Sequence, residues 1–284
     1  MQFWRVRKTI GILMVGVLLL GAGFIAGCGN KSDNEKNSAG LTGTLTVAGS
    51  TSVQPFSEVL AEKFMALNKG VQVNVQGGGS SVGIEAAISG AAGIGSTSRA
   101  VTTEEKAQGL VDTTIALDGI AVVVHPSNPI GVMKNADVMN IYLGNIKNWK
   151  EIGGPDAPIT VVTREDGSGT REAFTSLVMN KKDIIKTAIV QNSTGAVRAT
   201  VAGDKNAIGY VSLSSVDQSV KALQIDGVAA TEANVKNGTY KLQRPFIYVT
   251  KGEPTGFAKA FIDFVLSPEG QKLIVEEGAV SVNK

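Results

Sequence analysis

The sequence predicts an α/β fold, because segments with the periodicity of strands alternate along the chain with segments that have the periodicity of helices. Apolar residues alternate in segments 41–47 and 71–75, as in half-buried strands, whereas they recur at helical spacing in segment 56–67. Small polar loops separate the two kinds of segment. A chain of 284 residues can also bury a sizeable core, and its length favours two lobes.

The first two units of the expected fold share the order of strand, polar loop and helix. Strand 41–47 is followed by a small polar loop, and Pro55 suits the first turn of the helix that comes next. Strand 71–75 ends at three consecutive glycines, and a second helix is expected over residues 82–88.

The later elements continue this alternation. A short strand is expected at 91–96, and the apolar, β-branched run at 115–125 is typical of a buried strand. Strand 159–163 leads into the polar loop 164–170, after which a helix is expected over residues 171–179.

The N-terminal segment has the composition of a lipoprotein signal peptide, which we assign to residues 1–27. Three basic residues precede an apolar run over residues 10–25, and small residues precede Cys28. This order resembles the bacterial lipobox, in which the cysteine is acylated, for example with palmitate, and anchors the protein to the outer face of the cell membrane. The alternatives are an uncleaved anchor helix, for which the run is short of the roughly 20 residues that span a bilayer, and an unmodified thiol.

The segment that follows, residues 28–40, is polar and is expected to form a flexible tether. The whole chain has 27 Lys and Arg against 25 Asp and Glu, but the signal peptide contains three of the bases and no acid, which leaves 24 against 25. The basic balance therefore belongs to the signal peptide, and we expect no nucleic-acid partner. Aromatic residues make up only 5% of the chain, which argues against a stacking surface for bases or sugars.

Three loops contain the residues that point to an anion. Residues 50–52, 79–81 and 167–170 each lie between a predicted strand and a predicted helix. A helix N-terminus exposes unpaired N–H groups, Ser and Thr add hydroxyl donors, and glycine lets the backbone approach a ligand closely. Helix capping uses the same residue types, so the prediction depends on three such loops rather than on one.

Arg164 precedes the third loop and adds a full positive charge on a planar fork that matches an oxyanion. Asp166, two residues later, could orient this fork or accept a proton from the ligand. The alternative for the pair is an ordinary surface salt bridge, which contributes little to stability.

Seven segments, in this order, resemble the phosphate-binding proteins of phosphate ABC transporters. They are residues 48–55, 76–81, 94–99, 118–126, 144–149, 164–170 and 203–210. The resemblance implies a type II periplasmic-binding-protein fold, with two α/β lobes, a ligand cleft between them and two hinge crossings near residues 120–124 and 245–249. It implies a lobe I at residues 41–120 and 246–284 and a lobe II at residues 121–245.

The resemblance also implies which residues contact the ligand. The positions that match the family's phosphate contacts are Thr51, Ser52, Ser80, Arg164, Ser168, Gly169 and Thr170. Some members have an aspartate where this chain has Ser98, and that carboxylate accepts the proton of hydrogen phosphate and repels sulfate. Ser98 can accept a hydrogen bond but cannot repel an anion, so Ser98 and Asp166 join the candidate ligand-binding residues. Arg99 either adds charge to the site or makes a salt bridge.

The predicted function is that of an exported, monomeric lipoprotein that binds inorganic phosphate, without cofactor or metal, and delivers it to an ABC permease and its ATPase subunits. The alternatives are a binding protein for another tetrahedral oxyanion, such as sulfate or molybdate, and a surface phosphate sensor or adhesin. A secreted phosphatase or esterase is disfavoured, because the only histidine, His125, ends an apolar strand before Pro126, where a structural or hinge role fits better than catalysis. With one histidine and one lipidated cysteine, a transition-metal site is also disfavoured.

Overall fold

The structure is a computed structural model that describes residues 42–283. The predicted signal peptide (1–27), the predicted lipidation residue Cys28 and the tether (28–40) lie outside the described residues, so these assignments stay predictions. Among residues 42–283, no helix combines the length and the apolar character that crossing a membrane requires.

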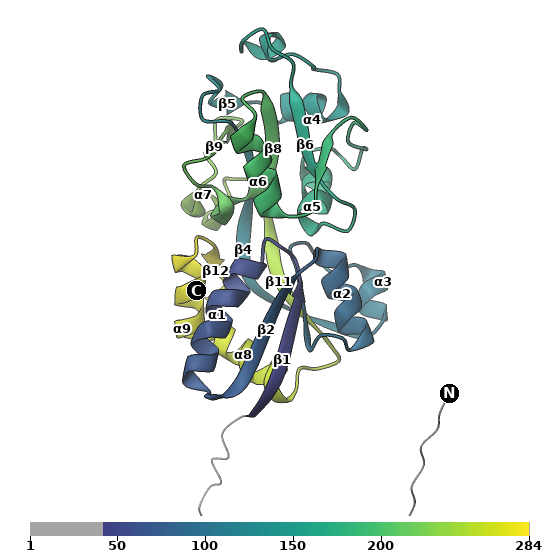
Figure 1. Ribbon diagram of the computed structural model, residues 1–284, viewed down its shortest axis with the longest axis vertical. Coiled ribbons are helices and arrows are strands. Elements are labelled where there is room, and N and C mark those ends of the chain that lie inside the picture. The colour runs from purple at the N-terminus through teal and green to yellow at the C-terminus, as the bar shows by residue number, and fades with distance from the viewer. Residues whose placement is uncertain (1–41, 284) are drawn as a thin grey trace, which may run out of the picture. The chain divides into compact units, whose positions relative to one another are not determined.

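The main sheet has the strand order β2-β1-β3-β11-β4-β8-β6-β7. Its longest strand, β4 (Leu110–Val124), pairs with β11 (Gln243–Lys251) along residues 110–119 and with β8 (Ala207–Ser212) along residues 120–124. Figure 1 shows β4 and β11 passing between a lower and an upper group of elements. We call these groups the lower lobe (residues 42–116 and 246–283) and the upper lobe (residues 120–242).

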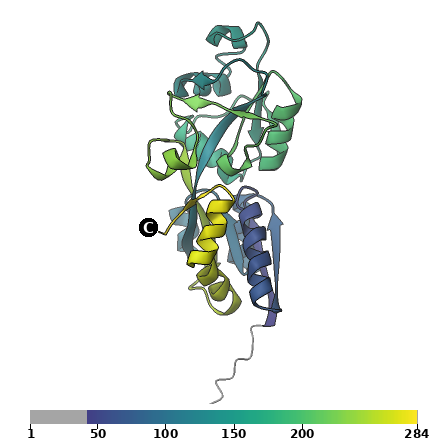
Figure 2. The ribbon, with the colours of Figure 1, turned by 90° about the vertical axis from the view of Figure 1, so that its left-hand side faces the viewer.

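The lower lobe contains both ends of the described chain. Its elements are β1 (Thr42–Gly49), α1 (Gln54–Leu67), β2 (Gly70–Gly77), α2 (Ser80–Ser89), β3 (Ile94–Thr97), α3 (Thr103–Ala107), α8 (Gly256–Leu266), α9 (Pro268–Glu276) and β12 (Val280–Ser281). β1 pairs in parallel with β2 and β3, as expected for strands that are connected through helices. Figure 2 shows α1 and α9 side by side in this lobe, where they contact each other.

The upper lobe is formed by the middle of the chain. Its elements are β5 (Val132–Met133), α4 (Asn135–Leu143), the 3₁₀ helix η1 (Trp149–Ile152), β6 (Thr160–Arg164), α5 (Gly169–Leu177), β7 (Ile189–Gln191), α6 (Thr194–Gly203), β8, the 3₁₀ helix η2 (Leu213–Ser215), β9 (Lys221–Ala222), β10 (Gln224–Ile225) and α7 (Glu232–Lys236). β6 pairs in parallel with β7 and β8.

Each lobe has its own hydrophobic core. In the lower lobe, Phe56 and Phe64 of α1 are buried against the sheet, and the ring of Phe56 meets that of Phe246 edge to face at 5.4 Å. Burying one such side chain contributes about 1.5–3 kcal/mol, so the helical spacing of the apolar residues in α1 fixes how the helix is placed on the sheet.

The upper core contains an aromatic cluster that supports the loop after β6. The rings of Phe174 and Tyr210 stack at 4.0 Å with an interplanar angle of 6°, and Tyr142 lies 4.7 Å from Phe174. The Tyr210 hydroxyl lies 2.7 Å from the Thr163 hydroxyl and accepts a hydrogen bond from the Arg164 backbone N–H at 3.3 Å. Burial raises the pKa of Tyr210 to about 12, so it is a neutral hydroxyl that holds the end of β6 in place.

The expected alternation of strands and helices agrees with the structure. Helices expected over residues 56–67, 82–88 and 171–179 correspond to α1, α2 and α5, with ends that differ by two residues at most. The first crossing lies slightly before the expected residues 120–124, because these residues already pair with β8 inside the upper lobe.

Candidate anion-binding site

Hydroxyl groups from both lobes meet at the N-termini of three helices. The Ser52 hydroxyl, in the turn before α1 of the lower lobe, lies 2.9 Å from the Thr170 hydroxyl and 2.8 Å from the Thr194 hydroxyl. Thr170 and Thr194 stand in the first turns of α5 and α6 in the upper lobe, and all three residues are buried. The Thr51 hydroxyl accepts a hydrogen bond from the Thr194 backbone N–H at 3.2 Å. The positive ends of these helix dipoles therefore point at one small polar region.

A second group of polar residues adjoins this region. The Ser80 hydroxyl accepts a hydrogen bond from the Ser98 backbone N–H at 3.1 Å, and the two hydroxyls lie 3.4 Å apart. Gly169 packs against both residues, because a Cβ atom at this position would lie 2.2 Å from the Ser80 hydroxyl and 2.9 Å from that of Ser98. Only glycine allows the first turn of α5 to approach α2 and the loop after β3 this closely.

Arg164, at the end of β6, adds a buried positive charge, since only 1% of its surface is exposed. Its Nη1 donates a hydrogen bond to the Thr194 hydroxyl at 3.1 Å. Its Nε and Nη2 donate to the two carboxylate oxygens of Glu165, each at 2.7 Å. This two-pronged pairing fixes the guanidinium plane, while Nη1 stays directed at the hydroxyl groups of Ser52, Thr170 and Thr194, which we call the hydroxyl cluster.

A second guanidinium lies on the other side of Ser52. Arg244, on β11, donates from Nη2 to the Ser52 hydroxyl at 3.2 Å and from Nη1 to the Ser98 carbonyl at 3.2 Å. Its Nε and Nη2 also donate to Asp118 Oδ2 at 3.1 and 3.0 Å, and Asp118 accepts a further hydrogen bond from the Ser212 hydroxyl at 2.7 Å. Burial raises the pKa of the Asp118 carboxyl, and its bonds to Arg244 and Ser212 oppose that rise.

Comparisons with known proteins identify the family of this chain. The family model described as a PBP superfamily domain matches residues 34–269. The phosphate-binding protein PstS of Bacillus subtilis is 38% identical over 289 residues, which cover 97% of this chain and 94% of the relative. The chain belongs to the PstS family of the PBP superfamily.

Solved structures of family members have the same fold. A crystal structure from Clostridium perfringens, of a substrate-binding protein assigned to phosphate ABC transport and containing bound phosphate, is 44% identical with a TM-score of 0.82, covering 85% of this chain and all of that one. An ABC-type phosphate transport receptor from Vibrio cholerae is 40% identical with a TM-score of 0.71, covering 83% of this chain and 99% of that one. The predicted fold class, two α/β lobes of the periplasmic-binding type, is confirmed.

The structure brings together all seven positions that match the family's phosphate contacts, and also Ser98, so that one candidate ligand-binding residue, Asp166, lies apart. Those that lie in or beside the hydroxyl cluster are Thr51, Ser52, Ser80, Ser98, Arg164, Ser168, Gly169 and Thr170. Ser168 is buried and its hydroxyl accepts a hydrogen bond from the Arg171 backbone N–H at 3.3 Å, so it caps α5. A capping hydroxyl still has its own proton to donate, so the capping and binding roles are compatible.

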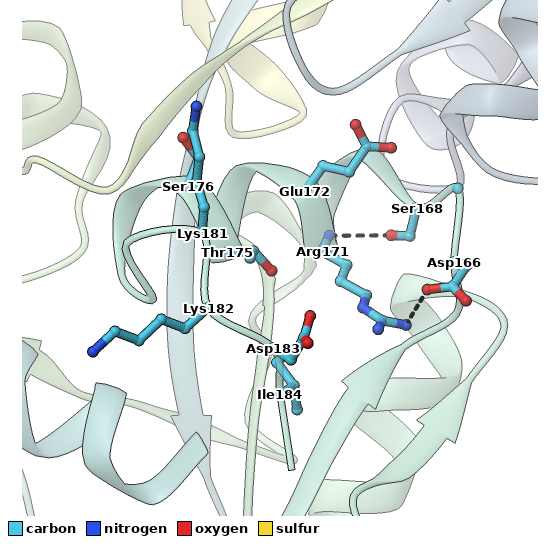
Figure 3. A pocket seen from close by; sticks show the side chains of 11 residues that line it. Asp166, Ser168, Arg171, Glu172, Thr175, Ser176, Lys181, Lys182, Asp183 and Ile184 are labelled. Carbon is cyan, nitrogen blue, oxygen red and sulfur yellow. Dashed lines mark hydrogen bonds and ion pairs between the residues drawn. The ribbon is translucent and has the colours of Figure 1, made fainter. Parts of the chain in front are cut away.

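The exception is Asp166, whose side chain is 97% exposed and pairs with the Arg171 guanidinium at 2.8 Å. It occupies the outer part of the turn from Glu165 to Ser168 and lines a surface cavity of about 290 Å³. Figure 3 shows its carboxylate beside Arg171. The prediction that Asp166 orients Arg164 is therefore wrong in this structure. Its neighbour Glu165 does so instead, because both of its carboxylate oxygens accept hydrogen bonds from the Arg164 guanidinium.

Arg99 makes salt bridges rather than adding charge to the cluster. Its guanidinium donates to both carboxylate oxygens of Glu105 at 2.8 and 2.7 Å and lies 2.6 Å from the Glu172 carboxylate of α5. The hydrogen bonds to Glu105 raise the pKa of Arg99. Because Arg99 follows β3 and Glu172 belongs to α5, this pairing also connects the two lobes.

Two further polar residues of the site, Thr194 and Arg244, are not predicted from the sequence. Thr194 is part of a Ser-Thr-Gly sequence at the start of a helix, which is the pattern of the other loops. The preceding strand β7 has only three residues, which are too few to show the alternation of a strand. Arg244 directly precedes the apolar run of residues 245–249 in β11, and a charge at the start of such a run is the available signal. Among residues 42–283, no group of three or more His, Cys, Asp or Glu residues is arranged to hold a metal ion.

Proposed function

We propose that this protein binds inorganic phosphate between its lower and upper lobes and delivers it to an ABC importer. The observation that carries this proposal is the buried meeting of the Ser52 hydroxyl of the lower lobe with the Thr170 and Thr194 hydroxyls of the upper lobe. Arg164 adds a buried guanidinium that donates to Thr194. Hydroxyl, backbone N–H and guanidinium groups can donate to a tetrahedral oxyanion the hydrogen bonds that water donates to it in solution. The relatives named as phosphate-binding proteins support phosphate as the ion.

Binding would favour the conformation in which the two lobes meet. An anion held by donors of both lobes interacts more strongly with that conformation than with an open one, and this difference shifts the equilibrium. The donors need little ordering, since Glu165 already fixes Arg164 and the helix turns fix the hydroxyls. The closed conformation would then be the one that the permease recognises.

The location and the anchor follow from the sequence. We propose export through the signal peptide at residues 1–27, acylation of Cys28, and a monomeric protein tethered by residues 28–40 to the outer face of the membrane. Mass spectrometry of protein extracted from membranes would detect the lipid on the peptide that begins at Cys28. A protein that begins at Met1, or an unmodified Cys28, would contradict this part of the proposal.

Isothermal titration of the purified protein with phosphate and sulfate tests the ligand. We expect saturable binding of phosphate at neutral pH with one site per chain, and weaker binding of sulfate. A protein that produces no heat with phosphate would refute the proposal. Turnover of phosphoesters by the purified protein, lost in a Ser168→Ala variant, would revive the enzyme alternative.

One observation keeps a second oxyanion under consideration. At the position where some relatives have an aspartate, this chain has Ser98, and the two carboxylates nearest the cluster, Glu165 and Asp118, are each engaged by an arginine. Sulfate and molybdate need no proton acceptor, so a tighter affinity for either ion than for phosphate would establish this alternative. Loss of phosphate uptake in cells lacking the protein would separate transport from a sensor or adhesin role.

A further inference from the structure

The Arg244–Asp118 pair lies in β11 and β4, the two strands that both lobes share. Its side chains are among the least accessible of the described chain, with 2% of Arg244 and none of Asp118 exposed. Removing two charges from water costs several kcal/mol per ion. Replacing a buried ion pair by apolar residues of similar volume is therefore often neutral or stabilising for the fold. The position of a buried ion pair beside the hydroxyl cluster therefore calls for a reason other than stability.

Asp118 does not use all the donors of Arg244. A guanidinium has five N–H donors, and those that do not face Asp118 reach the Ser98 carbonyl and the Ser52 hydroxyl. Both acceptors belong to the loops that line the candidate site. The positive charge is thus placed against the site, and Asp118 together with Ser212 holds it there.

The contact with Ser52 has a consequence for hydrogen-bond direction. A serine hydroxyl has one proton, and when its oxygen accepts from a guanidinium that proton is free for another acceptor. Arg164 has the same relation to Thr194, since its Nη1 donates to the Thr194 hydroxyl at 3.1 Å. The two arginines therefore flank two adjacent hydroxyls, one on each lobe, and favour both of them as donors.

We propose that Arg244 is a second anion-binding residue, whose guanidinium supplies charge from the shared strands and sets the Ser52 hydroxyl to donate to the ligand. This inference rests on the proposed function. It predicts that phosphate affinity depends on two guanidinium groups, of which only Arg164 lies in the upper lobe. Because its contacts are with loops of the lower lobe, Arg244 would act on an anion before the lobes close.

The test compares phosphate binding by the wild type, Arg244→Met and Arg244→Lys in isothermal titration. We expect Arg244→Met to weaken binding by at least about 30-fold, as for loss of one partner of a buried charged contact. Arg244→Lys keeps the positive charge without the planar fork, and its phosphate affinity should lie between those of the wild type and Arg244→Met. Lys63→Met is the matched control, because it removes a lower-lobe cation from a surface pair with Glu269 and should bind as the wild type does.

A double-mutant cycle separates a binding role from a purely structural one. If Arg244 acts partly through Ser52, then Arg244→Lys and Ser52→Ala should not have additive effects on phosphate affinity. Should Arg244→Met fail to fold, as judged by circular dichroism, Arg244→Lys and the cycle decide the question. Folded variants that bind phosphate within about threefold of the wild type overturn the inference but leave the proposed function intact. A wild type that binds no phosphate overturns the function itself.

Discussion

Removing the Arg164 guanidinium should be the most damaging single change at the site. Arg164 is 1% exposed, contacts the hydroxyl cluster through Thr194 and neutralises the Glu165 carboxylate. An Arg164→Met variant would lose the charged hydrogen bond that we propose between Arg164 and the ligand. It would also leave the negative charge of Glu165 beside an incoming anion. Truncating one partner of a buried charged pair costs about 2–5 kcal/mol.

The structure narrows this range. The Glu165 side chain is 25% exposed, so water would partly stabilise its carboxylate after Arg164 is removed. We therefore expect the lower half of the range, which corresponds to a loss of phosphate affinity of about 30- to 300-fold. The double variant Arg164→Met, Glu165→Gln removes the stranded charge as well and should recover about tenfold of that loss.

Isothermal titration with phosphate measures both effects, and circular dichroism establishes that each variant is folded. Lys150→Met is the matched control, because it removes an upper-lobe cation whose partner, Asp156, is on the surface. A folded Arg164→Met variant that binds phosphate within about threefold of the wild type would place Arg164 outside the binding site.

Three further changes have distinct outcomes. Gly169→Ala should weaken phosphate binding at least about tenfold and lower the melting temperature, because the added Cβ would lie 2.2 Å from the Ser80 hydroxyl. An unchanged phosphate affinity would contradict the close packing of Gly169 against Ser80. Asp166→Asn should change phosphate affinity by less than about threefold, because the carboxylate faces solvent; a large loss would restore it to the site. The hydrogen bond from Arg99 lowers the pKa of the Glu105 carboxyl. The ionised carboxylate therefore stabilises the fold fully at pH values above its ordinary pKa of 4.5, and this stabilisation is lost as the pH falls through the lowered pKa. Glu105→Gln keeps a capping acceptor and should therefore show a smaller decrease in denaturant-measured stability between about pH 5 and pH 3 than the wild type; an equal decrease would assign the pH dependence to other groups.

Local periodicity was sufficient to predict most of the fold. The alternation of residues 71–75 and the helical spacing of residues 56–67 are set by one buried face in each element, and the structure buries those faces. Short elements such as β9 and β12 were not predicted, because two residues are too few to show a period. Their position depends on pairing with β4, which is a tertiary contact.

Side-chain direction limited the prediction of the site. Ser52, Ser80 and Thr170 could be predicted because a strand-to-helix turn places their hydroxyls at a helix N-terminus whatever surrounds them. The choice between Glu165 and Asp166 as partner of Arg164 depends on where β6 ends and the turn begins, which shifts a side chain from the cluster to solvent. Arg244 could not be connected with Ser52, because they are 192 residues apart and meet as a result of tertiary pairing, in which β3 lies between β1 and β11.

A crystal structure of the protein grown with phosphate would show directly whether both lobes enclose the ion. We expect tetrahedral density within hydrogen-bond distance of Ser52 from the lower lobe and of both Thr170 and Arg164 from the upper lobe. Density that contacts residues of one lobe only, or that lies away from Arg164, would contradict an ion enclosed by both lobes.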